Sequence, residues 1–509
     1  METALDPRRW WALGAMSVSL IVVGLDLTVL NVALPTLATE LDASISQLQW
    51  FANAYTLVLA ALLLPAGLLG DRFGQKRLLI GALVMFGAAS AACAFASSPG
   101  ELIVFRAALG IGAAFLIPLS MSLINILFAP EERGRAITLW VMANSLGIPL
   151  GPVLGGWLLD HYRWGSIFLI NVPLVLIGVV AVALLVPAIR GHRSGRIDVL
   201  GIGLSGVGLV ALTYGFVSAG ERGWGDPLTL GGIALGLVLL AAFGIWQTRA
   251  VDPLVDLGLF KSREFTWGTV LATVASFALM GLLFVLPQLF QAVQGADALQ
   301  TGLRLLPIIG GLLVGAKVAE RLVLAVGARV TVAVGFVLMF GGLVAGAFTG
   351  VGDSYGYAAI WVSVVGLSIG FTLPPVMEMA TGALSAERSG AGSGLIQALR
   401  QVGGTIGVAL LGTVLNSAYR DKLDVAGLPP AVADAARDSA SGAVAIAAKT
   451  GSSSLAQSAR EAFIHGMNAT LWTCCTVAVL GLLLAVAYLP RRSAVSVDEG
   501  PAEVVTIKS

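Results

Sequence analysis

Apolar stretches of about 20 residues recur along the whole chain and are separated by shorter polar segments. A helix of roughly 20 residues crosses the hydrocarbon core of a bilayer, where no water satisfies the backbone. The pattern therefore predicts an all-α polytopic membrane protein with about fourteen transmembrane helices. The predicted spans cover residues 11–33, 48–70, 78–97, 101–126, 136–159, 166–186, 198–218, 228–247, 265–289, 301–319, 330–348, 356–378, 393–416 and 468–488.

The composition also indicates a membrane protein. The chain of 509 residues is 57% hydrophobic and 12% charged, with a mean hydropathy of +0.90. These values lie far from those of a soluble domain. The net charge is +1, and the Lys and Arg residues are scattered over short loops. This distribution argues against a nucleic-acid partner, which would require basic residues gathered on one face.

The distribution of basic residues predicts the orientation of the chain. With the N-terminus inside, the inner loops and tails hold 20 of the 30 Lys and Arg, and the outer loops hold seven, five of them in one long loop. The first span follows Arg8 and Arg9, is too long for a signal peptide and lacks a small-residue cleavage site, so we expect it to be retained. An even number of spans then places both termini in the cytoplasm of a multi-pass protein of the cell membrane.

Neither the cysteines nor the histidines form a pattern typical of a metal or catalytic site. The cysteines lie in predicted spans and the histidines in predicted loops: Cys93, Cys474, Cys475, His161, His192 and His465. A phosphate-binding loop ending in Gly-Lys-Ser or Gly-Lys-Thr is also absent from the sequence. We therefore expect no enzyme activity, no metal and no cofactor, and any coupling to ATP would need another subunit.

The fifth predicted span combines glycines and prolines in an unusual way. Its six special positions are Gly147, Pro149, Gly151, Pro152, Gly155 and Gly156. Glycines spaced by four residues form a stripe without side chains, along which a second helix can approach closely. Each proline removes a backbone donor and loosens the helix, which a membrane tolerates only where neighbouring helices cover the backbone. The segment indicates either a transporter or a plain packing seam.

The chain repeats itself weakly, which indicates two related halves. Residues 67–77 read GLLGDRFGQKR, and residues 315–321 and 327–329 are a degenerate echo without the Asp-Arg-x-Gly core. Internal repeats are how many secondary transporters build two bundles around a central site. We predict one six-helix bundle in residues 1–190 and another in residues 265–490. Two inserted helices occupy 191–264, a long outer loop occupies 417–466, and 491–509 form a disordered cytoplasmic tail.

Four segments together make a family resemblance specific. They are residues 25–35 in the first span, 67–77, 102–110 in the fourth span and 147–156, with further support from 164–173 and 399–407. In this order the chain resembles a fourteen-span drug/proton antiporter of the major facilitator superfamily. The resemblance implies two six-helix bundles plus two inserted helices, and export of a small, often amphipathic compound against proton entry, without ATP. We expect a monomer in the lipid bilayer.

Three charged residues are candidates for proton coupling. Asp26 is the acid placed well inside the first bundle, and low dielectric favours the protonated form of a carboxyl group. Arg106 in the fourth span stays charged and would favour the ionised carboxylate when close. Glu378 falls at the cytoplasmic end of the twelfth span and is the third candidate. Asp26 could instead only hydrogen-bond Thr28, Asn31 or another helix, and Arg106 could only tie helices to backbone carbonyls.

Residues 67–77 lie at the cytoplasmic side in this topology. Seven of them are candidates for an inner gate: Gly67, Gly70, Asp71, Arg72, Gly74, Lys76 and Arg77. Gly70 and Gly74 permit a tight turn, and Asp71 can accept hydrogen bonds from a facing helix N-terminus. By resemblance the segment is a latch that holds the halves together when the carrier opens outward. The alternative is that its basic residues serve orientation alone.

Polar and aromatic residues near the span centres and ends are candidates for substrate contact. They are Asn31, Asn53, Tyr55, Trp140, Asn144, Gln288, Gln291 and Arg400. Aromatic residues near span ends are more often interface anchors. The resemblance favours a proton-coupled exporter of drugs or antibiotics. A proton-coupled symporter of a metabolite, and a membrane scaffold or lipid-handling protein without proton coupling, remain as alternatives.

Overall fold

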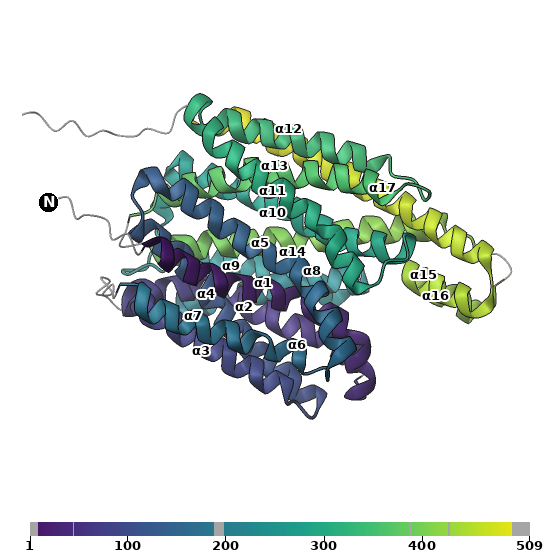
Figure 1. Ribbon diagram of the computed structural model, residues 1–509. Helices are drawn as coiled ribbons and strands as arrows, with labels where there is room; N and C mark the ends of the chain where they lie inside the picture. The colour runs from purple at the N-terminus through teal and green to yellow at the C-terminus, as the bar shows by residue number, and fades with distance from the viewer. Residues whose placement is uncertain (1–8, 44, 188–197, 386–388, 426–427, 491–509) are drawn as a thin grey trace, which may run out of the picture.

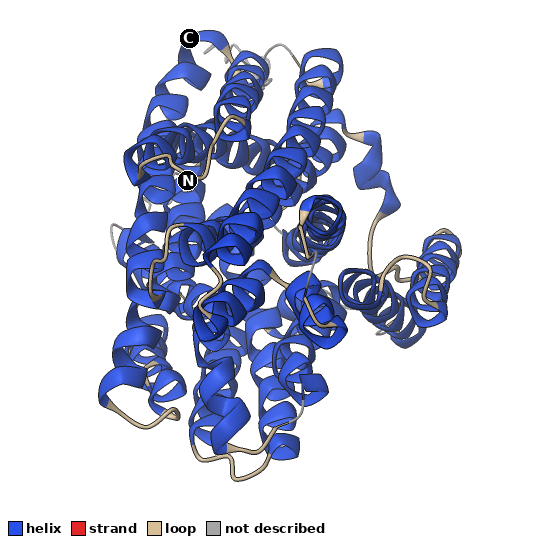
Figure 2. Cartoon of the chain, turned by 90° about the vertical axis from the view of Figure 1, so that its right-hand side faces the viewer, coloured by secondary structure: helices blue, strands red, loops and turns tan. Residues whose placement is uncertain are grey.

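The computed structural model describes residues 9–43, 45–187, 198–385, 389–425 and 428–490, which form helices joined by short loops, with no β-strand among them. Figure 1 shows the helices by label, and Figure 2 shows the same chain coloured by secondary structure. The helices are α1 (Arg9–Glu40), α2 (Ile45–Phe73), α3 (Gln75–Ala94), α4 (Pro99–Leu127), α5 (Pro130–His161), α6 (Ser166–Leu169), α7 (Asn171–Leu185), α8 (Val199–Arg222), α9 (Pro227–Gln247), the 3-10 helix η1 (Leu257–Lys261), α10 (Arg263–Gln288), the π-helix η2 (Leu289–Val293), α11 (Ala298–Val326), α12 (Ala328–Ala347), α13 (Tyr355–Gly382), α14 (Ser389–Lys422), α15 (Pro430–Asp438), α16 (Ala440–Thr450) and α17 (Ser453–Tyr488). The predicted all-α class is confirmed.

Thirteen segments of the described residues are helices long and apolar enough to cross a membrane. They correspond to thirteen of the predicted spans. The remaining predicted span, residues 301–319, lies in α11, a helix of 29 residues that carries Arg304, Lys317 and Glu320. α11 packs along α13 and α5, so it lies among the long helices that span the membrane.

The two halves of the chain repeat one pattern of helix contacts. In the first half α1 packs against α5 and α7, α2 against α4, and α3 against α4 and α7. In the second half α10 packs against α14 and α17, α11 against α13, and α12 against α13 and α17. The pairings match one to one, as expected for two six-helix bundles related by the weak sequence repeat. The bundles meet through α2 with α14 and through α5 with α11.

The sequence repeat appears in the structure as two single-residue turns. Gly74 alone separates α2 from α3 and has a φ of 93°, and Gly327 joins α11 to α12 with a φ of 89°. Such positive φ values favour glycine, which has no Cβ. The expectation that Gly70 also forms part of a turn is wrong, because α2 continues through that residue.

The glycine stripe of α5 packs against α1. A methyl group added at Gly147 or Gly151 would overlap the backbone of α1, and one at Gly24 of α1 would overlap the Asn144 carbonyl of α5. α5 remains helical through both of its internal prolines. The stripe therefore brings two helix backbones together, as its spacing predicts.

The second bundle uses the same device. Gly403 and Gly407 of α14 lie against the backbone carbonyls of Thr273 and Phe277 in α10. In the contact pattern of the two halves, α10 and α14 occupy the places of α1 and α5. Each bundle therefore contains a pair of helices whose glycines let the two backbones approach closely.

The inserted helices α8 and α9 pack against each other beside one of the two seams between the bundles. α8 contacts both α2 and α14, and Trp224 just after α8 donates a hydrogen bond of 2.8 Å from Nε1 to Thr413 of α14. Asp198 caps the start of α8 and accepts hydrogen bonds from Trp246 and Gln247 at the end of α9, each at 2.8 Å. The insertion thus covers the α2/α14 seam.

The long segment 417–466 is largely helical. α14 continues to Lys422, α17 begins at Ser453, and α15 and α16 form a hairpin between them, visible at the right of Figure 1. Tyr419 donates a hydrogen bond of 2.8 Å to the Ala436 carbonyl, and α16 packs along α17. The described residues of the predicted long loop therefore include two short helices between two long ones. The predicted tail 491–509 lies outside the described residues.

Replacing Gly151 by valine is expected to destabilise the first bundle. The added side chain overlaps the backbone of α1, and overpacking of this kind typically costs about 1–3 kcal/mol. Thermal unfolding of the purified protein, followed by circular dichroism, should show a lower midpoint. Gly81→Val in α3 is the matched control, because a Cβ at Gly81 meets nothing within 4 Å. Equal midpoints for the two variants would contradict the packing.

Candidate functional site

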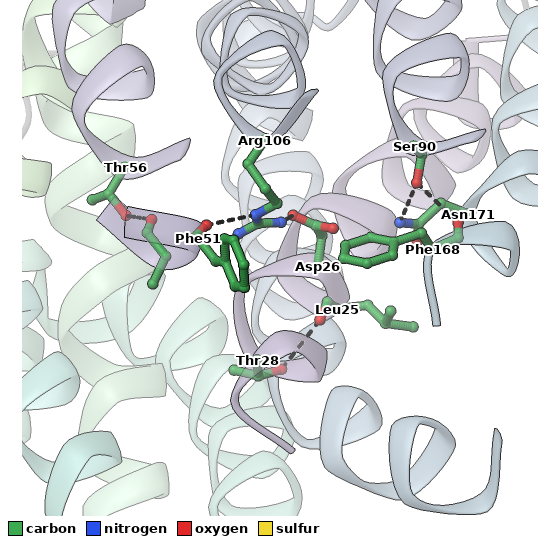
Figure 3. Close-up of polar contacts among 10 residues, drawn as sticks. Leu25, Asp26, Thr28, Phe51, Thr56, Ser90, Arg106, Phe168 and Asn171 are labelled. Atoms are coloured by element: carbon green, nitrogen blue, oxygen red, sulfur yellow. Dashed lines mark hydrogen bonds and ion pairs between the residues drawn. The ribbon is translucent and has the colours of Figure 1, made fainter. Parts of the chain in front are cut away.

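An ion pair between α1 and α4 lies in the interior of the first bundle. Nη1 of Arg106 is 2.5 Å from Oδ2 of Asp26, and Nε of the same guanidinium donates a 2.9 Å hydrogen bond to the Phe51 carbonyl of α2. Figure 3 shows the guanidinium between these two oxygens. Its carbon lies 4.7 Å from the centre of the Tyr55 ring. One arginine therefore joins three helices.

The pair is fully shielded from solvent. Asp26 is 0% and Arg106 is 1% exposed. Removing one partner of such a pair typically costs about 3–5 kcal/mol, because the other charge is left buried without a partner. Oδ1 of Asp26 has no hydrogen-bond partner among the described residues. The described contacts of the carboxylate therefore use one of its two oxygens.

The glycine stripe of α5 holds the part of α1 that carries this carboxylate. Gly151 lies against the Leu25 carbonyl and the Thr28 side chain, on either side of Asp26 in the chain. Thr28 donates to the Leu25 carbonyl at 3.3 Å. The side chain of Asn31 lies outside the described part of the structure. Arg106, one of the partners considered from the sequence, contacts Asp26 and also donates to a backbone carbonyl.

Asp71 connects the two bundles at the end of α2. Its carboxylate oxygens accept hydrogen bonds of 2.9 Å from the backbone N–H groups of Gly390 and Ala391, in the first turn of α14. Its exposed fraction is 6%. A helix N-terminus presents unpaired N–H groups and a partial positive charge, so a carboxylate there is favourable. The contact joins residues 319 and 320 positions apart.

A chain of side-chain hydrogen bonds supports this contact. Nε2 of Gln75 donates to Asp71 at 3.3 Å and to Ser122 of α4 at 2.5 Å, and Ser122 is 2.6 Å from the Ser389 hydroxyl of α14. Sequence reasoning did not identify Gln75, Ser122 or Ser389. Gln75 lies within the 67–77 segment and could have been included, whereas a serine in an apolar span carries no comparable signal.

The glycines of the same segment permit close packing. Gly67 lies against the backbone of Gly390, so α2 and α14 touch without an intervening side chain. Gly70 lies against the Leu119 side chain of α4. Within the 67–77 segment, Gly67 and Asp71 therefore contact the second bundle.

The basic residues of the segment make different contacts. The Arg72 guanidinium lies 5.8 Å from the Phe73 ring, and Nζ of Lys76 donates to the Ala183 carbonyl of α7 at 2.7 Å. Arg77 is exposed. The described contacts of Arg72 and Lys76 stay within the first bundle, as expected of charges that orient the chain.

Glu378 lies near the end of α13, where the two bundles also meet. Its carboxylate is half-buried and lies against Gly134 in the first turns of α5. Arg133 and Glu320 are close enough to act on it electrostatically. Arg133 itself donates hydrogen bonds to backbone carbonyls at the end of α4. The carboxylate thus lies at the same end of the molecule as the Asp71 contact.

The candidate substrate residues do not form one group. Tyr55 packs on Arg106, and Trp140 is buried and donates a 2.9 Å hydrogen bond to Ser120. Asn53 and Asn144 are half-buried. In the second half of the chain, Gln288 donates to the carbonyl of Phe284 in its own helix, and Gln291 is exposed. Arg400 lies in α14. These contacts place the candidates on several helices.

A small apolar pocket lies where α5, α10, α11 and α13 meet. Its lining residues are Ser145, Pro149, Leu279, Leu283, Leu305, Ile308, Ile309, Leu312 and Ile369. The cavity volume is about 10 Å³, which is room for about one water molecule. A drug-sized compound can enter this region only after the helices move apart.

Comparison with known proteins identifies relatives over nearly the whole chain. The chain is 32% identical over 503 residues to the tetracenomycin C resistance and export protein of Streptomyces glaucescens, covering 96% of this chain and 93% of the relative. It is 35% identical to the multidrug efflux pump LfrA of Mycolicibacterium smegmatis, covering 92% and 94%. It is 34% identical to the puromycin resistance protein pur8 of Streptomyces alboniger, covering 84% and 86%.

Solved structures share the fold. The human organic anion transporter MFSD10 superposes with a TM-score of 0.63 at 15% identity, over 94% of this chain and 100% of that one. A bacterial homologue of the human lysosomal transporter Spinster, in an inward-facing conformation, gives 0.59 at 16% identity, over 96% and 100%. The family model of the major facilitator superfamily matches residues 16–408. The chain is a multi-pass plasma-membrane protein that belongs to the major facilitator superfamily.

Proposed function

We propose that this protein is a proton-coupled antiporter that exports small amphipathic drugs or antibiotics from the cytoplasm by alternating access. The observation that carries the proposal is the buried pair of Asp26 and Arg106. Burying a carboxylate and a guanidinium inside a membrane bundle costs free energy. Such residues generally serve a function. The relatives named for resistance to tetracenomycin C and puromycin, and for multidrug efflux, support the substrate class.

The pair provides a means to couple protonation to helix position. While the two groups are in contact, the Arg106 guanidinium balances the negative charge of the Asp26 carboxylate, and a proton would balance that charge once the helices move the two groups apart. The guanidinium also contacts α2, because its Nε donates to the Phe51 carbonyl of that helix. A change at Asp26 is therefore transmitted to α2, which carries Asp71 in its last turn. α2 therefore links the Asp26–Arg106 pair to the contact between the bundles.

Alternating access requires that the bundles separate at one end and then at the other. At the end where α2 meets α14, Asp71 and the Gln75–Ser122–Ser389 chain hold the bundles together. We assign this end to the cytoplasm from the basic residues of the loops. The structure thus corresponds to a carrier closed on that side, and breaking a few hydrogen bonds opens it.

Two other functions are separated from this one by flux measurements. A symporter that imports a metabolite would move substrate inward with protons, and a scaffold or lipid-handling protein would show no proton-dependent flux. The direction of substrate movement under an imposed pH gradient distinguishes all three. We further propose that the carrier works as a monomer, with the proton gradient in place of ATP and without a bound cofactor.

Replacing Asp26 by asparagine is expected to abolish proton-driven exchange. Asparagine keeps the shape but carries no titratable proton, and it leaves Arg106 without an anionic partner. Proteoliposomes with an internal pH dye would be exposed to puromycin and tetracenomycin C, and substrate-induced proton movement should fall to the rate of protein-free liposomes. Asp353→Asn, in the loop before α13 where the carboxylate accepts from Gly350, is the matched control and should keep full exchange. Unchanged exchange in Asp26→Asn would exclude Asp26 as the proton carrier.

Replacing Asp71 by asparagine is expected to favour separation of the bundles at the α2/α14 end. Hydrogen bonds to a charged acceptor contribute about 1.5–3 kcal/mol, so the equilibrium should shift about tenfold or more. Spin labels at Leu184 and Leu324, which are 74% and 86% exposed, would report the distance between the bundles by pulsed electron resonance. The long-distance population should grow in Asp71→Asn and stay constant in Asp353→Asn. Identical distance distributions in the two variants would rule out the latch.

A further inference from the structure

Arg400 is a half-buried cation of the second bundle that has no acidic partner among the described residues. Its Nε donates to the Ser276 hydroxyl of α10 at 3.0 Å, and its Nη1 donates to Oε1 of Gln397 at 2.9 Å. No carboxylate of the described residues forms an ion pair with it. The first bundle is different, because there Asp26 neutralises Arg106. An uncompensated charge at this depth is costly, and such residues generally mark ligand or ion pathways.

Two neighbouring side chains on α14 also have unused hydrogen-bonding capacity. The Nε2 group of Gln397 and the hydroxyl of Ser393 are buried and have no hydrogen-bond partner among the described residues. The orientation of the Gln397 amide follows from its contact with Arg400, because Oε1 must accept from the guanidinium and Nε2 is then a donor. Ser393, Gln397 and Arg400 therefore offer hydrogen-bond donors that the described residues leave free.

These three side chains lie on one face of α14. Spacings of four and three residues place positions 393, 397 and 400 above one another on a helix. Ser389, four residues before Ser393, extends the same face and contacts Ser122 of α4 in the other bundle. The face therefore points toward the seam between the bundles, which becomes accessible when they separate. Ser276, its partner on α10, is in the middle of that helix.

We propose that Ser393, Gln397 and Arg400 bind an anionic oxygen group of the exported compound, such as a carboxylate, phenolate or enolate. A planar guanidinium with adjacent N–H and O–H donors matches the geometry of two oxygens that share a negative charge. The inference rests on the proposed export function and specifies its substrate class. Exchange of one proton for one such anion moves two charges across the membrane, so the potential that drives protons inward also drives the anion outward.

The experiment measures binding of aryl acids and their neutral amides to the purified full-length protein by equilibrium dialysis. The probes are 2-naphthoate, anthracene-2-carboxylate and anthraquinone-2-carboxylate, each paired with its carboxamide. Each pair has the same shape and differs in charge. At least one carboxylate should bind about tenfold or more tightly than its amide, as expected for charge-assisted hydrogen bonds. A panel in which no carboxylate is preferred to its amide would overturn the proposal.

Variants locate the preference. Arg400→Gln should remove the preference for the carboxylate over the amide, and Arg400→Lys should keep part of it. Gln397→Glu should also remove the preference, because the new carboxylate neutralises Arg400, which stays in place. Arg304→Gln is the matched control, because Arg304 is also an arginine within a long helix but is bonded to Gln294 at 2.9 Å near the start of α11. Persistence of the preference in Arg400→Gln, or its loss in Arg304→Gln, would overturn the assignment.

The binding assay requires no gradient, so it is independent of the export function. Charge preference without proton-coupled flux would reject the antiporter and retain the anion site. Proton-coupled flux without charge preference would reject the site and retain the antiporter. Thermal unfolding midpoints within a few degrees of the unaltered protein show that each variant is folded, and the Gln397→Glu variant keeps the test valid if Arg400→Gln fails to fold.

Discussion

A lipid environment offers no hydrogen-bond partners, and this constraint governs both the backbone and the buried charges of the protein. The backbone meets it by forming long helices throughout the described residues. The charges meet it individually. Asp26 is paired with Arg106, Asp71 accepts from two backbone N–H groups of α14, and the partners of Arg400 among the described residues are neutral. The first two arrangements stabilise one arrangement of helices, and the third leaves a positive charge for a ligand.

Glycine determines how closely the helices approach, and so where these charges can meet. The stripe of α5 brings it against α1 on both sides of Asp26, and Gly67 lets α2 reach the first turn of α14 at Asp71. A larger side chain at either place would overlap the facing helix and force the two helices apart. Packing and polar contacts therefore depend on each other, because the small residues set the distances at which the carboxylates find their partners.

The two bundles repeat one arrangement of helices but not its chemistry. Arg106 belongs to α4 and has an acid in its own bundle, whereas Arg400 belongs to α14 and has none among the described residues. The inserted helices add a second asymmetry, because α8 covers the α2/α14 seam and the apolar pocket lies beside the α5/α11 seam. A symmetric fold thus holds a buried ion pair in one half and, among the described residues, an arginine without an acidic partner in the other.

The sequence by itself determined the helical class, the two halves, and the residue types at the site. Hydropathy, the spacing of Gly147, Gly151 and Gly155, and a lone aspartate in an apolar span are local properties, and lipid allows few structures that satisfy them. Only the tertiary structure decided which groups meet. Asp26 and Arg106 are 80 positions apart, and Asp71 and Gly390 are 319 apart, so their contacts depend on how helices pack. The Ser122–Ser389 contact and the hairpin of α15 and α16 were decided in the same way, because each depends on a neighbour that no local pattern specifies.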